Sequence, residues 1–388
     1  MIPYGRQEIT EEDISEVEKV LRSDFLTQGP TVPKFEKSVA DYCGTSYAVA
    51  VNSATSALHI ACLALDLGPG DLLWTSPNTF VASANCGRYC GADIDFVDID
   101  PKTYNMCVNA LSKKLIKAEK LGKLPKILIP VHFAGQPCDM PSIYDLSKRY
   151  GFKIIEDASH AIGASYDKIK VGSCSHSDIT VFSFHPVKII TTGEGGMALT
   201  NNKNVADKIS SLRTHGITKD KKKMKKRPED EIWNYQQIDL GFNYRMNDIQ
   251  AALGLNQMKR LDEYIKRRHQ IAKYYNSELR DLPLVTPLQK PENYSSYHLY
   301  PLRVKNNLDY KIQKQVYQEL IDNKILVNLH YIPVHRHPYY ENLGFKKNDF
   351  PEAEKFHQQA ISIPMYAILK NEHQEHVIKT LKKIKIIR

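Results

Sequence analysis

The stretch that decides the fold class is Tyr47–Leu65, YAVAVNSATSALHIACLAL. A short run of valines and small apolar residues, typical of a buried strand, leads through Asn52 and Ser53 into an alanine-rich helical segment. Between about residues 44 and 200 the same alternation predicts further strands: Leu72–Thr75, Ile94–Val97, Lys126–Phe133, Lys153–Glu156 and Ile179–Phe184. Strands that alternate with helices indicate βαβ units and a mainly parallel sheet covered on both faces.

The pattern changes after about residue 241. Apolar residues then recur at helical spacing and predict one long amphipathic helix: Leu255, Met258, Leu261 and Ile265. Beyond it we expect a strand and two helices: His298–Val304, Lys311–Asn323 and Pro351–Ile361. The sequence therefore predicts two parts, an N-terminal arm with a large α/β domain over residues 1–250 and a smaller α+β domain over residues 251–388.

The composition is that of an ordinary globular protein. Of the 388 residues, 42% are hydrophobic and 25% are charged, which excludes collagen-like, coiled-coil and disordered chains. The segment Met1–Phe25 carries charges throughout and has no apolar core typical of a signal peptide. No apolar run approaches the roughly 20 residues that span a bilayer. We therefore expect a cytoplasmic protein that does not bind membranes.

The formal charge of +9 is concentrated in one segment, Lys219–Arg227, which is rich in lysine. A solvated loop is one interpretation of this segment, and a loop that guards a polyanionic small substrate is another. Nucleic acid is disfavoured as a partner because no aromatic residues interleave with the basic ones.

The seven cysteines include no CxxC pair. Cys86 and Cys90 lie four residues apart in a helical stretch, a spacing that would allow a metal site. Small buried thiols in a reducing compartment are the favoured interpretation, and we expect no metal.

Polar segments follow several predicted strands, at the sheet edge where ligands bind. The segment Asn52–Ala57 combines a helix N-terminus with three hydroxyl side chains, which makes it a candidate phosphate site as well as an ordinary helix cap. Asp157 and His160 follow the strand over 153–156, where Asp157 could instead cap the next helix. Lys188 lies between a buried strand and a glycine-rich turn, where a lysine could act as a nucleophilic amine.

Together these segments supply a phosphate cradle, an acidic group and a reactive lysine in one cleft. Pyridoxal 5′-phosphate requires this combination, because the lysine forms a Schiff base, the carboxylate keeps the pyridine nitrogen protonated and a helix end holds the phosphate. The sequence therefore predicts pyridoxal phosphate as cofactor.

With these residues in place, the chain resembles the DegT-type sugar-nucleotide aminotransferases, whose fold is type I of the pyridoxal-phosphate-dependent transferases. The resemblance covers almost the whole chain, in these segments: LTQGP at Leu26–Pro30, NSATSAL at Asn52–Leu58, SPNTFVASAN at Ser76–Asn85, EDASHAIG at Glu156–Gly163, SFHPVK at Ser183–Lys188 and GFNYRMNDIQAALG at Gly241–Gly254. It implies an α/β fold with a mainly parallel, seven-stranded sheet between helices, plus the smaller C-terminal domain.

The resemblance also implies how the cofactor ring is held. Lys188, the catalytic residue, would bond to the cofactor, and Asp157 would pair with the pyridine nitrogen. His160 would lie near the ring hydroxyl, and Phe80 would stack on the ring.

For the phosphate, the resemblance implies Thr55, Ser56 and Ser183 as ligands. Asn243 would reach the phosphate bound by the partner subunit. This implies a homodimer with shared active sites.

Within the family, the segments Met1–Gln7, Leu26–Pro30 and Leu329–His335 are similar to the aminotransferases of pseudaminic acid biosynthesis, which serves flagellin glycosylation. Such an enzyme moves an amino group from L-glutamate to C4 of a UDP-4-keto-6-deoxy-N-acetylhexosamine. The substrate would be UDP-2-acetamido-2,6-dideoxy-β-L-arabino-hex-4-ulose and the product UDP-4-amino-4,6-dideoxy-N-acetyl-β-L-altrosamine. The similarity implies these contacts with the nucleotide sugar: Tyr4, Leu26, Thr27, Gln28, Gly29, His330, Tyr331, Ile332 and Pro333.

Several alternatives stay open at this point. The nucleotide sugar could be a precursor of perosamine, bacillosamine or legionaminic acid, or the chain could be a non-enzymatic sensor that binds pyridoxal phosphate. Related sugar dehydratases carry histidine where this chain has Lys188, which argues against that activity. A nicotinamide oxidoreductase is disfavoured because no G-x-G-x-x-G follows a strand. A metal at His330, His335 and His337 is disfavoured because Pro333 and Pro338 indicate a rigid loop without a nearby carboxylate.

Overall fold

The computed structural model describes residues 1–226, 231–305 and 310–384, except for the side chain of Tyr310. Of the lysine-rich segment predicted above, Arg227 lies outside the described residues.

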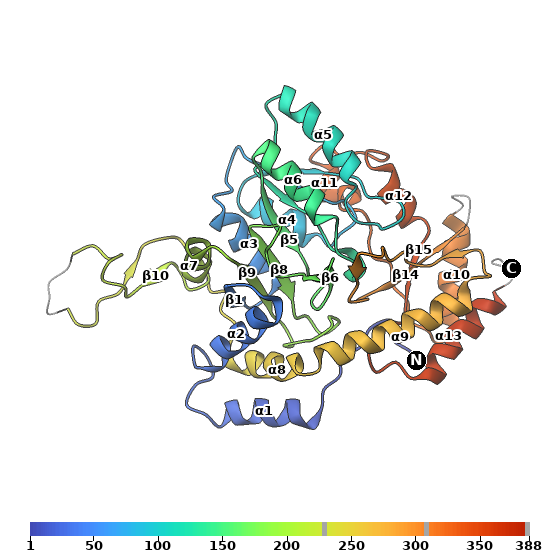
Figure 1. Ribbon diagram of the computed structural model, residues 1–388, viewed down its shortest axis with the longest axis horizontal. Coiled ribbons are helices and arrows are strands. Elements are labelled where there is room, and N and C mark those ends of the chain that lie inside the picture. Colours follow the sequence, from blue (N-terminus) through green and yellow to red (C-terminus); the bar gives the residue numbers. More distant parts are fainter. Residues whose placement is uncertain (227–230, 306–309, 385–388) are drawn as a thin grey trace.

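A seven-stranded sheet lies at the centre of the molecule (Figure 1) and consists of β1 (Tyr47–Val51), β2 (Leu72–Thr75), β3 (Asp93–Phe96), β4 (Ile127–Ile129), β5 (Lys153–Asp157), β8 (Ile179–Ser183) and β9 (Gly196–Thr200). Its order is β1-β9-β8-β5-β4-β2-β3. The strands from β8 to β3 are parallel, whereas β9 runs antiparallel to both β1 and β8. The prediction of a mainly parallel sheet is therefore confirmed. The strand predicted over 126–133 is shorter because Pro130 follows β4 and the chain then turns into a 3-10 helix at Phe133–Gly135.

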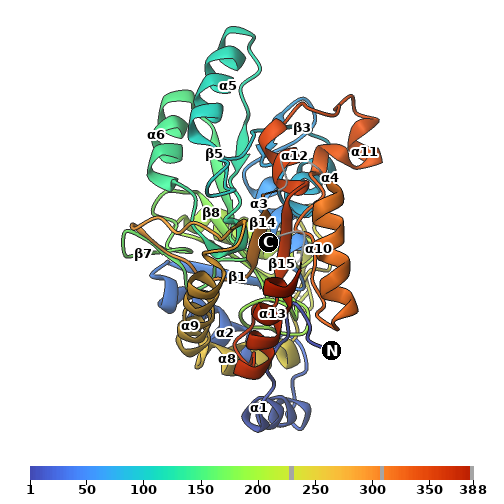
Figure 2. The same cartoon turned by 90° about the vertical axis from the view of Figure 1, so that its right-hand side faces the viewer.

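Helices cover both faces of this sheet: α2 (Thr31–Cys43), α3 (Ala54–Ala64), α4 (Ala82–Tyr89), α5 (Val108–Lys120), α6 (Met140–Tyr150) and α7 (Lys203–Leu212). Successive side chains of a strand point to opposite faces. Leu73 therefore joins the core beneath α3, α4 and α7, whereas its neighbour Trp74 joins the core beneath α5 and α6. Figure 2 places α5 and α6 on one side of the sheet and α3 and α4 on the other, as the sequence predicts.

A smaller antiparallel sheet of order β12-β14-β15 forms in the C-terminal part from Leu284–Val285, Tyr300–Val304 and Ala360–Ile363. It shares a second core with α9 (Leu261–Leu279), α10 (Tyr310–Asp322) and α13 (Asn371–Lys383). The remaining short elements are α11 (Pro338–Glu341), α12 (Pro351–His357), a 3-10 helix at Val334–Arg336, and a sheet of β13 (Asn293–Tyr294), β6 (Ser165–Tyr166) and β7 (Ile169–Lys170). The predicted boundary after residue 250 falls within α8 (Asp248–Met258), which packs on α1 (Glu11–Leu21) and α2. The division into two domains stays a prediction.

The single long helix predicted through Leu255 and Ile265 is wrong, because the chain leaves the helix between α8 and α9. Arg260 has φ −107° and ψ 3°, and its guanidinium donates to Asp13 at 2.6 Å and to the hydroxyl of Tyr264 at 2.9 Å. These contacts with α1 and α9 turn the chain, so that α8 packs on α1 while α9 extends over the C-terminal sheet (Figure 1).

The helix predicted over Pro351–Ile361 is also shorter than expected. It ends as α12 at His357, and Ala360–Ile363 forms β15 instead. The four residues of β15 are buried and pair with β14, so sheet pairing decides their conformation.

The described residues around 214–226 and 231–240 belong to an arm that projects from the rest of the molecule (Figure 1). It contains β10 (Ile217–Thr218) and β11 (Gln236–Gln237), which pair antiparallel. Most of its residues from 219 to 226 are exposed lysines, and the apolar side chains of Ile232 (90%) and Trp233 (73%) are exposed as well.

None of the helices in the described part of the chain is long and apolar enough to cross a membrane. All seven cysteines are free thiols, and all but Cys107 are buried, as predicted.

Candidate active site

A cavity of about 570 Å³ lies beyond the carboxyl ends of β5 and β8, closed on its other side by the segment 328–331. Nine of the residues predicted from the sequence line it: Tyr4, Thr55, Phe80, Asp157, His160, Ser183, Lys188, His330 and Tyr331. These residues come from positions 4 to 331, so the fold brings together segments that are far apart in the chain.

Asp157 is the last residue of β5 and is 5% exposed. Its Oδ1 accepts hydrogen bonds from the Ser159 amide (3.1 Å) and hydroxyl (2.6 Å), and its Oδ2 accepts one from the Ser83 hydroxyl at 2.5 Å. Donors on both oxygens hold the carboxylate in one orientation at the cavity wall.

Lys188 follows β8 in a tight turn, in which its amide donates to the carbonyl of His185 at 2.9 Å. Its amine makes no hydrogen bond or ion pair with any residue that the structure describes. Burial lowers the pKa of Lys188 to about 8, although the nearby Asp157 carboxylate opposes this shift. About a tenth of the amine is therefore uncharged, and nucleophilic, at pH 7, far more than for a lysine of ordinary pKa.

Helix α3 begins at the cavity. Ser53 is its N-cap and accepts the amide of Ser56 at 3.1 Å, while the amides of Ala54 and Thr55 start the first turn, where a helix offers no acceptors of its own. Gly196 lies against this turn, since a Cβ at that position would be 2.4 Å from the amide nitrogen of Ala54. The absence of a side chain at Gly196 therefore lets β9 approach the helix N-terminus, a favourable site for an anionic phosphate.

Ser56, also predicted to bind phosphate, does not line the cavity. Its hydroxyl donates to Asn52 at 2.7 Å and lies 3.0 Å from the Ser53 hydroxyl, so it completes the helix cap. Ser183 and Thr55 do line the cavity.

His160 and His330 are uncharged histidines that share the cavity with Lys188. His160 Nδ1 accepts the amide of Ala134 at 3.3 Å, which places the ring hydrogen on Nε2, 3.2 Å from the Tyr331 hydroxyl. Burial and the charge of Lys188 keep the pKa of His160 well below its usual value. Burial and Lys188 likewise lower the pKa of His330 to about 3, so both imidazoles are neutral at physiological pH.

Phe80 lies at the cavity mouth with 58% of its surface exposed, and its ring centroid is 6.3 Å from that of Tyr331. Elsewhere in the cavity wall, the ring of Tyr4 packs on His330 with centroids 5.4 Å apart. An exposed aromatic face at a cavity mouth is available to stack on a planar ligand.

Other predicted site residues do not line this cavity within one protomer. Residues 26–29 lie at the start of α8. There the Asp248 carboxylate accepts a hydrogen bond from the amide of Gly29 at 2.8 Å, and the amide of Asp248 donates one to the carbonyl of Leu26. Asn243 lies at the base of the arm and pairs with Thr214. Ile332 and Pro333 continue the segment that closes the cavity, with Ile332 46% exposed.

Among the polar residues of the site that were not predicted from the sequence are Ser83, Ser159, His298 and Glu194. Ser159 follows Asp157 by two positions, a spacing at which its hydroxyl can return to the carboxylate, so that residue could have been found. The other three offer no local signal.

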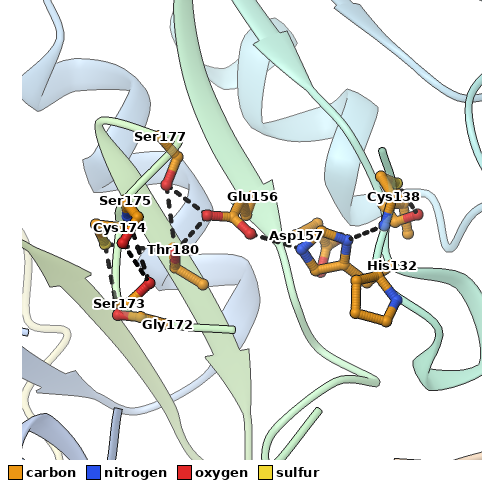
Figure 3. Close-up of polar contacts among 12 residues, drawn as sticks. His132, Cys138, Glu156, Asp157, Gly172, Ser173, Cys174, Ser175, Ser177 and Thr180 are labelled. Carbon is orange, nitrogen blue, oxygen red and sulfur yellow. Dashed lines mark hydrogen bonds and ion pairs between the residues drawn. The ribbon is translucent and has the colours of Figure 1, made fainter. Parts of the chain in front are cut away.

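A buried polar network supports β5 beside the site (Figure 3). His132 Nδ1 accepts the amide of Cys138 at 3.0 Å, and its Nε2 donates to Glu156 at 2.6 Å. Burial raises the pKa of Glu156, but the hydrogen bonds that it accepts from His132, Ser177 and Thr180 outweigh burial and lower that pKa below its usual value. Because Glu156 directly precedes Asp157, this network fixes the strand end that carries the site carboxylate.

Among the residues that the structure describes, no group of three or more His, Cys, Asp or Glu side chains is arranged to hold a metal ion. The expectation that no carboxylate lies near the three histidines considered above is wrong, because Nε2 of His335 lies 3.0 Å from the Glu354 carboxylate. Glu354 also accepts a hydrogen bond from Arg336 at 3.3 Å, so it is engaged in a structural contact within the protein.

The residues fit pyridoxal phosphate. An unpaired amine of lowered pKa lines the cavity together with a carboxylate held by two serines. The N-terminus of α3 borders the cavity through Ser53, Ala54 and Thr55, a favourable site for an anion, and an exposed aromatic ring lies at the mouth. These are the groups that the cofactor needs for covalent attachment, for its ring nitrogen, for its phosphate and for stacking.

Comparisons with known proteins place the chain among aminotransferases. The model of the DegT/DnrJ/EryC1/StrS aminotransferase family matches residues 7–382. The chain is 38% identical to the spore coat polysaccharide biosynthesis protein SpsC of Bacillus subtilis, over 99% of this chain and 97% of that protein. It is 36% identical to the UDP-4-amino-4,6-dideoxy-N-acetyl-beta-L-altrosamine transaminase of Campylobacter jejuni, over 99% and 96%.

Two solved structures have nearly the same fold. PseC of Helicobacter pylori, an aminotransferase involved in the biosynthesis of pseudaminic acid, superposes with a TM-score of 0.88 at 31% identity, over 98% of both chains. The PLP form of the Streptococcus pneumoniae protein Spr1654 gives 0.88 at 30% identity, over 98% of this chain and 97% of that one. The predicted fold and the predicted cofactor, pyridoxal phosphate, are thereby confirmed. The chain belongs to the DegT/DnrJ/EryC1/StrS aminotransferase family.

Proposed function

We propose that this chain transfers the amino group of L-glutamate to C4 of UDP-2-acetamido-2,6-dideoxy-β-L-arabino-hex-4-ulose, giving UDP-4-amino-4,6-dideoxy-N-acetyl-β-L-altrosamine for pseudaminic acid and flagellin glycosylation. The observation that carries the aminotransferase chemistry is the presence of Lys188 and Asp157 in one cavity. The sugar substrate is supported by the similarity to the Campylobacter transaminase and to PseC.

When bound, the cofactor supplies an electron sink that stabilises negative charge on the carbon next to the transferred nitrogen. Lys188 first removes the proton from that carbon of glutamate and later returns a proton to C4 of the sugar. A pKa of about 8 suits both tasks, because the amine is present in both protonation states near neutral pH. Asp157 would pair with the protonated ring nitrogen, and the N-terminus of α3 would hold the phosphate.

A second candidate is the same transfer to another nucleotide 4-ketosugar, of the perosamine, bacillosamine or legionaminic acid type. It is supported by the identity to SpsC, which is as high as that to the Campylobacter transaminase. Purified protein should be incubated with glutamate and each candidate ketosugar, and the products compared by mass and by the configuration at C4 from NMR couplings. We expect the arabino-ulose to be aminated on the order of tenfold faster than the other ketosugars, which corresponds to about 1.4 kcal/mol of stronger transition-state binding. A preference for another sugar would overturn the first candidate.

A sensor that binds the cofactor without turnover is the remaining alternative. Adding glutamate to the yellow protein distinguishes it from an enzyme. If the protein is an enzyme, we expect the absorbance at about 400–430 nm to disappear and one equivalent of 2-oxoglutarate to be released. An unchanged spectrum would support the sensor.

We further propose that the active unit is a cytoplasmic homodimer in which Asn243 of each protomer serves the other protomer's cofactor. This proposal is supported by the position of Asn243 at the base of the arm, where it does not line its own cavity. Mixing an inactive Lys188→Ala chain with an inactive Asn243→Ala chain should restore part of the activity, because mixed dimers then contain one intact site. Mixtures that stay inactive, although mixed dimers form, would contradict shared sites.

A further inference from the structure

His298 lines the cavity, although it lies two residues before β14 in the C-terminal part of the chain. Its side chain is 4% exposed, and neither ring nitrogen forms a hydrogen bond with a residue that the structure describes. A buried polar atom without a partner costs folding free energy, and such atoms are rare in native proteins. Nδ1 of His298 is such a buried atom without a partner among the described residues, and the ring lines the cavity that a ligand enters.

The backbone around His298 is firmly held without help from the imidazole. Arg268, itself 2% exposed, donates from Nη1 to the carbonyls of Tyr297 at 3.1 Å and His298 at 3.2 Å. The hydroxyl of Ser296 donates to the carbonyl of His160 at 2.5 Å. The segment thus presents the ring at a fixed position beside His160.

The rings of His298 and His160 lie against each other with centroids 4.4 Å apart. Both nitrogens of His160 already have protein partners, the amide of Ala134 and the hydroxyl of Tyr331. Burial, together with the charges of Lys188 and other neighbours, keeps the pKa of His298 well below its usual value. The ring is therefore neutral, with one donor and one acceptor nitrogen that no described residue engages.

The structure of pyridoxal phosphate indicates which of its groups would lie near His298. Lys188 would bond to the aldehyde carbon of the ring, and Asp157 would face the ring nitrogen on the opposite side. The ring hydroxyl of pyridoxal phosphate is attached next to the aldehyde-bearing carbon, on the side where His160 is expected. His298 lies directly against His160 and close enough to Lys188 to feel its charge.

We propose that His298 is a cofactor-binding residue whose imidazole forms a hydrogen bond with the ring hydroxyl of pyridoxal phosphate. The inference rests on the cofactor and not on the sugar substrate of the proposed function.

The test compares two ligands of the full-length apoprotein: pyridoxal phosphate and its analogue without the ring hydroxyl. In His298→Phe the ring can still pack on His160 but has no nitrogen. Pyridoxal phosphate should then bind about five- to tenfold more weakly, the range expected for one hydrogen bond, while binding of the analogue stays within about twofold. In His298→Gln, which keeps a hydrogen-bonding group, the preference for the hydroxylated ligand should largely return.

His269→Phe is the matched control. His269 belongs to the same region, stacks on Tyr294 at 4.3 Å and bonds to the carbonyl of Ser295 at 2.7 Å, but lies outside the cavity. Its loss should lower the melting temperature without changing either dissociation constant.

Two results would overturn the proposal: unchanged binding of both ligands by His298→Phe, and equal weakening of both. If His298→Phe does not fold, a His298→Gln protein that binds the two ligands equally well would also overturn it. No sugar is present in these titrations, so their failure leaves the sugar assignment intact, and failure of the ketosugar assays leaves this result intact.

Discussion

Ser83 and Asp157 lie 74 positions apart in the sequence, yet the serine hydroxyl donates to the aspartate Oδ2 at 2.5 Å inside the protein. The same hydroxyl lies 2.8 Å from that of Thr79, so helix α4 and the segment before it share in holding the carboxylate. The orientation of Asp157 therefore depends on a helix that contributes no group to the predicted chemistry.

We expect Ser83→Ala to weaken retention of pyridoxal phosphate by about three- to tenfold, because one oxygen of Asp157 loses its donor and the carboxylate can rotate. The rate of cofactor loss during dialysis measures this effect. Asp157→Ala should lose the cofactor far faster, and Thr79→Val, which keeps the bond from Ser83 to Asp157, should lose it at a rate between those of Ser83→Ala and wild type. Retention by Ser83→Ala at the wild-type rate would contradict a supporting role.

The pKa of Lys188, about 8, predicts how the apoprotein captures its cofactor. The uncharged amine attacks the aldehyde, so the rate of capture should rise with pH and level off above about 8. In Asp157→Asn the midpoint should move to lower pH, because the carboxylate that favours the ammonium form is gone. Stopped-flow absorbance from neutral to alkaline pH gives both curves, and a midpoint near the ordinary lysine value of 10.5 would contradict the environment described for Lys188.

The same pKa has a consequence for the stability of the apoprotein. Below pH 8 the buried amine is protonated in the folded chain, which costs stability because the unfolded chain holds that proton in water. The cost disappears as the pH rises from about 8 to 10.5. The difference in unfolding free energy between Lys188→Met and wild type should shrink over that window in urea titrations. A difference that is independent of pH would be inconsistent with a depressed pKa.

Gly196→Ala should specifically damage phosphate binding. The new Cβ would be 2.4 Å from the amide nitrogen of Ala54, so the first turn of α3 must move. We expect the preference for pyridoxal phosphate over pyridoxal, which lacks the phosphate, to fall on the order of tenfold. Gly68→Ala, where a Cβ meets nothing within 4 Å, is the control and should behave as wild type.

Asp13→Asn tests the anchor between α1 and α8. Asp13 is fully buried and accepts hydrogen bonds from Asn256, Gln257 and Arg260 at 2.6–2.8 Å. Burial alone would raise the pKa of Asp13, but these partners lower it below its ordinary value of 3.8. The carboxylate therefore stabilises the fold at neutral pH, and this stabilisation is lost as the pH falls through the lowered pKa. Asparagine should cost about 2–4 kcal/mol of unfolding free energy at neutral pH, measured in urea, and that cost should shrink in acid.

The parts of the site that could be predicted are those with a local cause. Asp157 ends one predicted strand, Lys188 follows another, and Thr55 lies in the first turn of the helix predicted after Tyr47–Val51. A residue at the carboxyl end of a parallel strand lies at the ligand-binding edge of the sheet. The strand pattern therefore placed these three residues at that edge, whereas their roles came from the resemblance to the family.

The features that were missed depend on contacts between distant segments. The break between α8 and α9 follows from a bond between Arg260 and Asp13, 247 positions apart, and no periodicity of the helix itself predicts it. His298 reaches the cavity because Arg268 and Ser296 fix its backbone against distant segments. Such residues become visible once the tertiary structure places both partners together.

The antiparallel strand β9 links the two anchors of the cofactor. Gly196 is paired with Val51 on one side and with Ser183 on the other, so the same residue aligns the end of β1, which leads to the phosphate, with the end of β8, which leads to the lysine. The smallest portable module that carries both anchors is accordingly discontinuous, comprising residues 47–58 and 179–200. Chimeras between relatives should exchange both segments or neither. If only one segment is exchanged, the hydrogen bonds that pair β9 with β1 and β8 join strands from different parents, and the ends of β1 and β8 are no longer aligned.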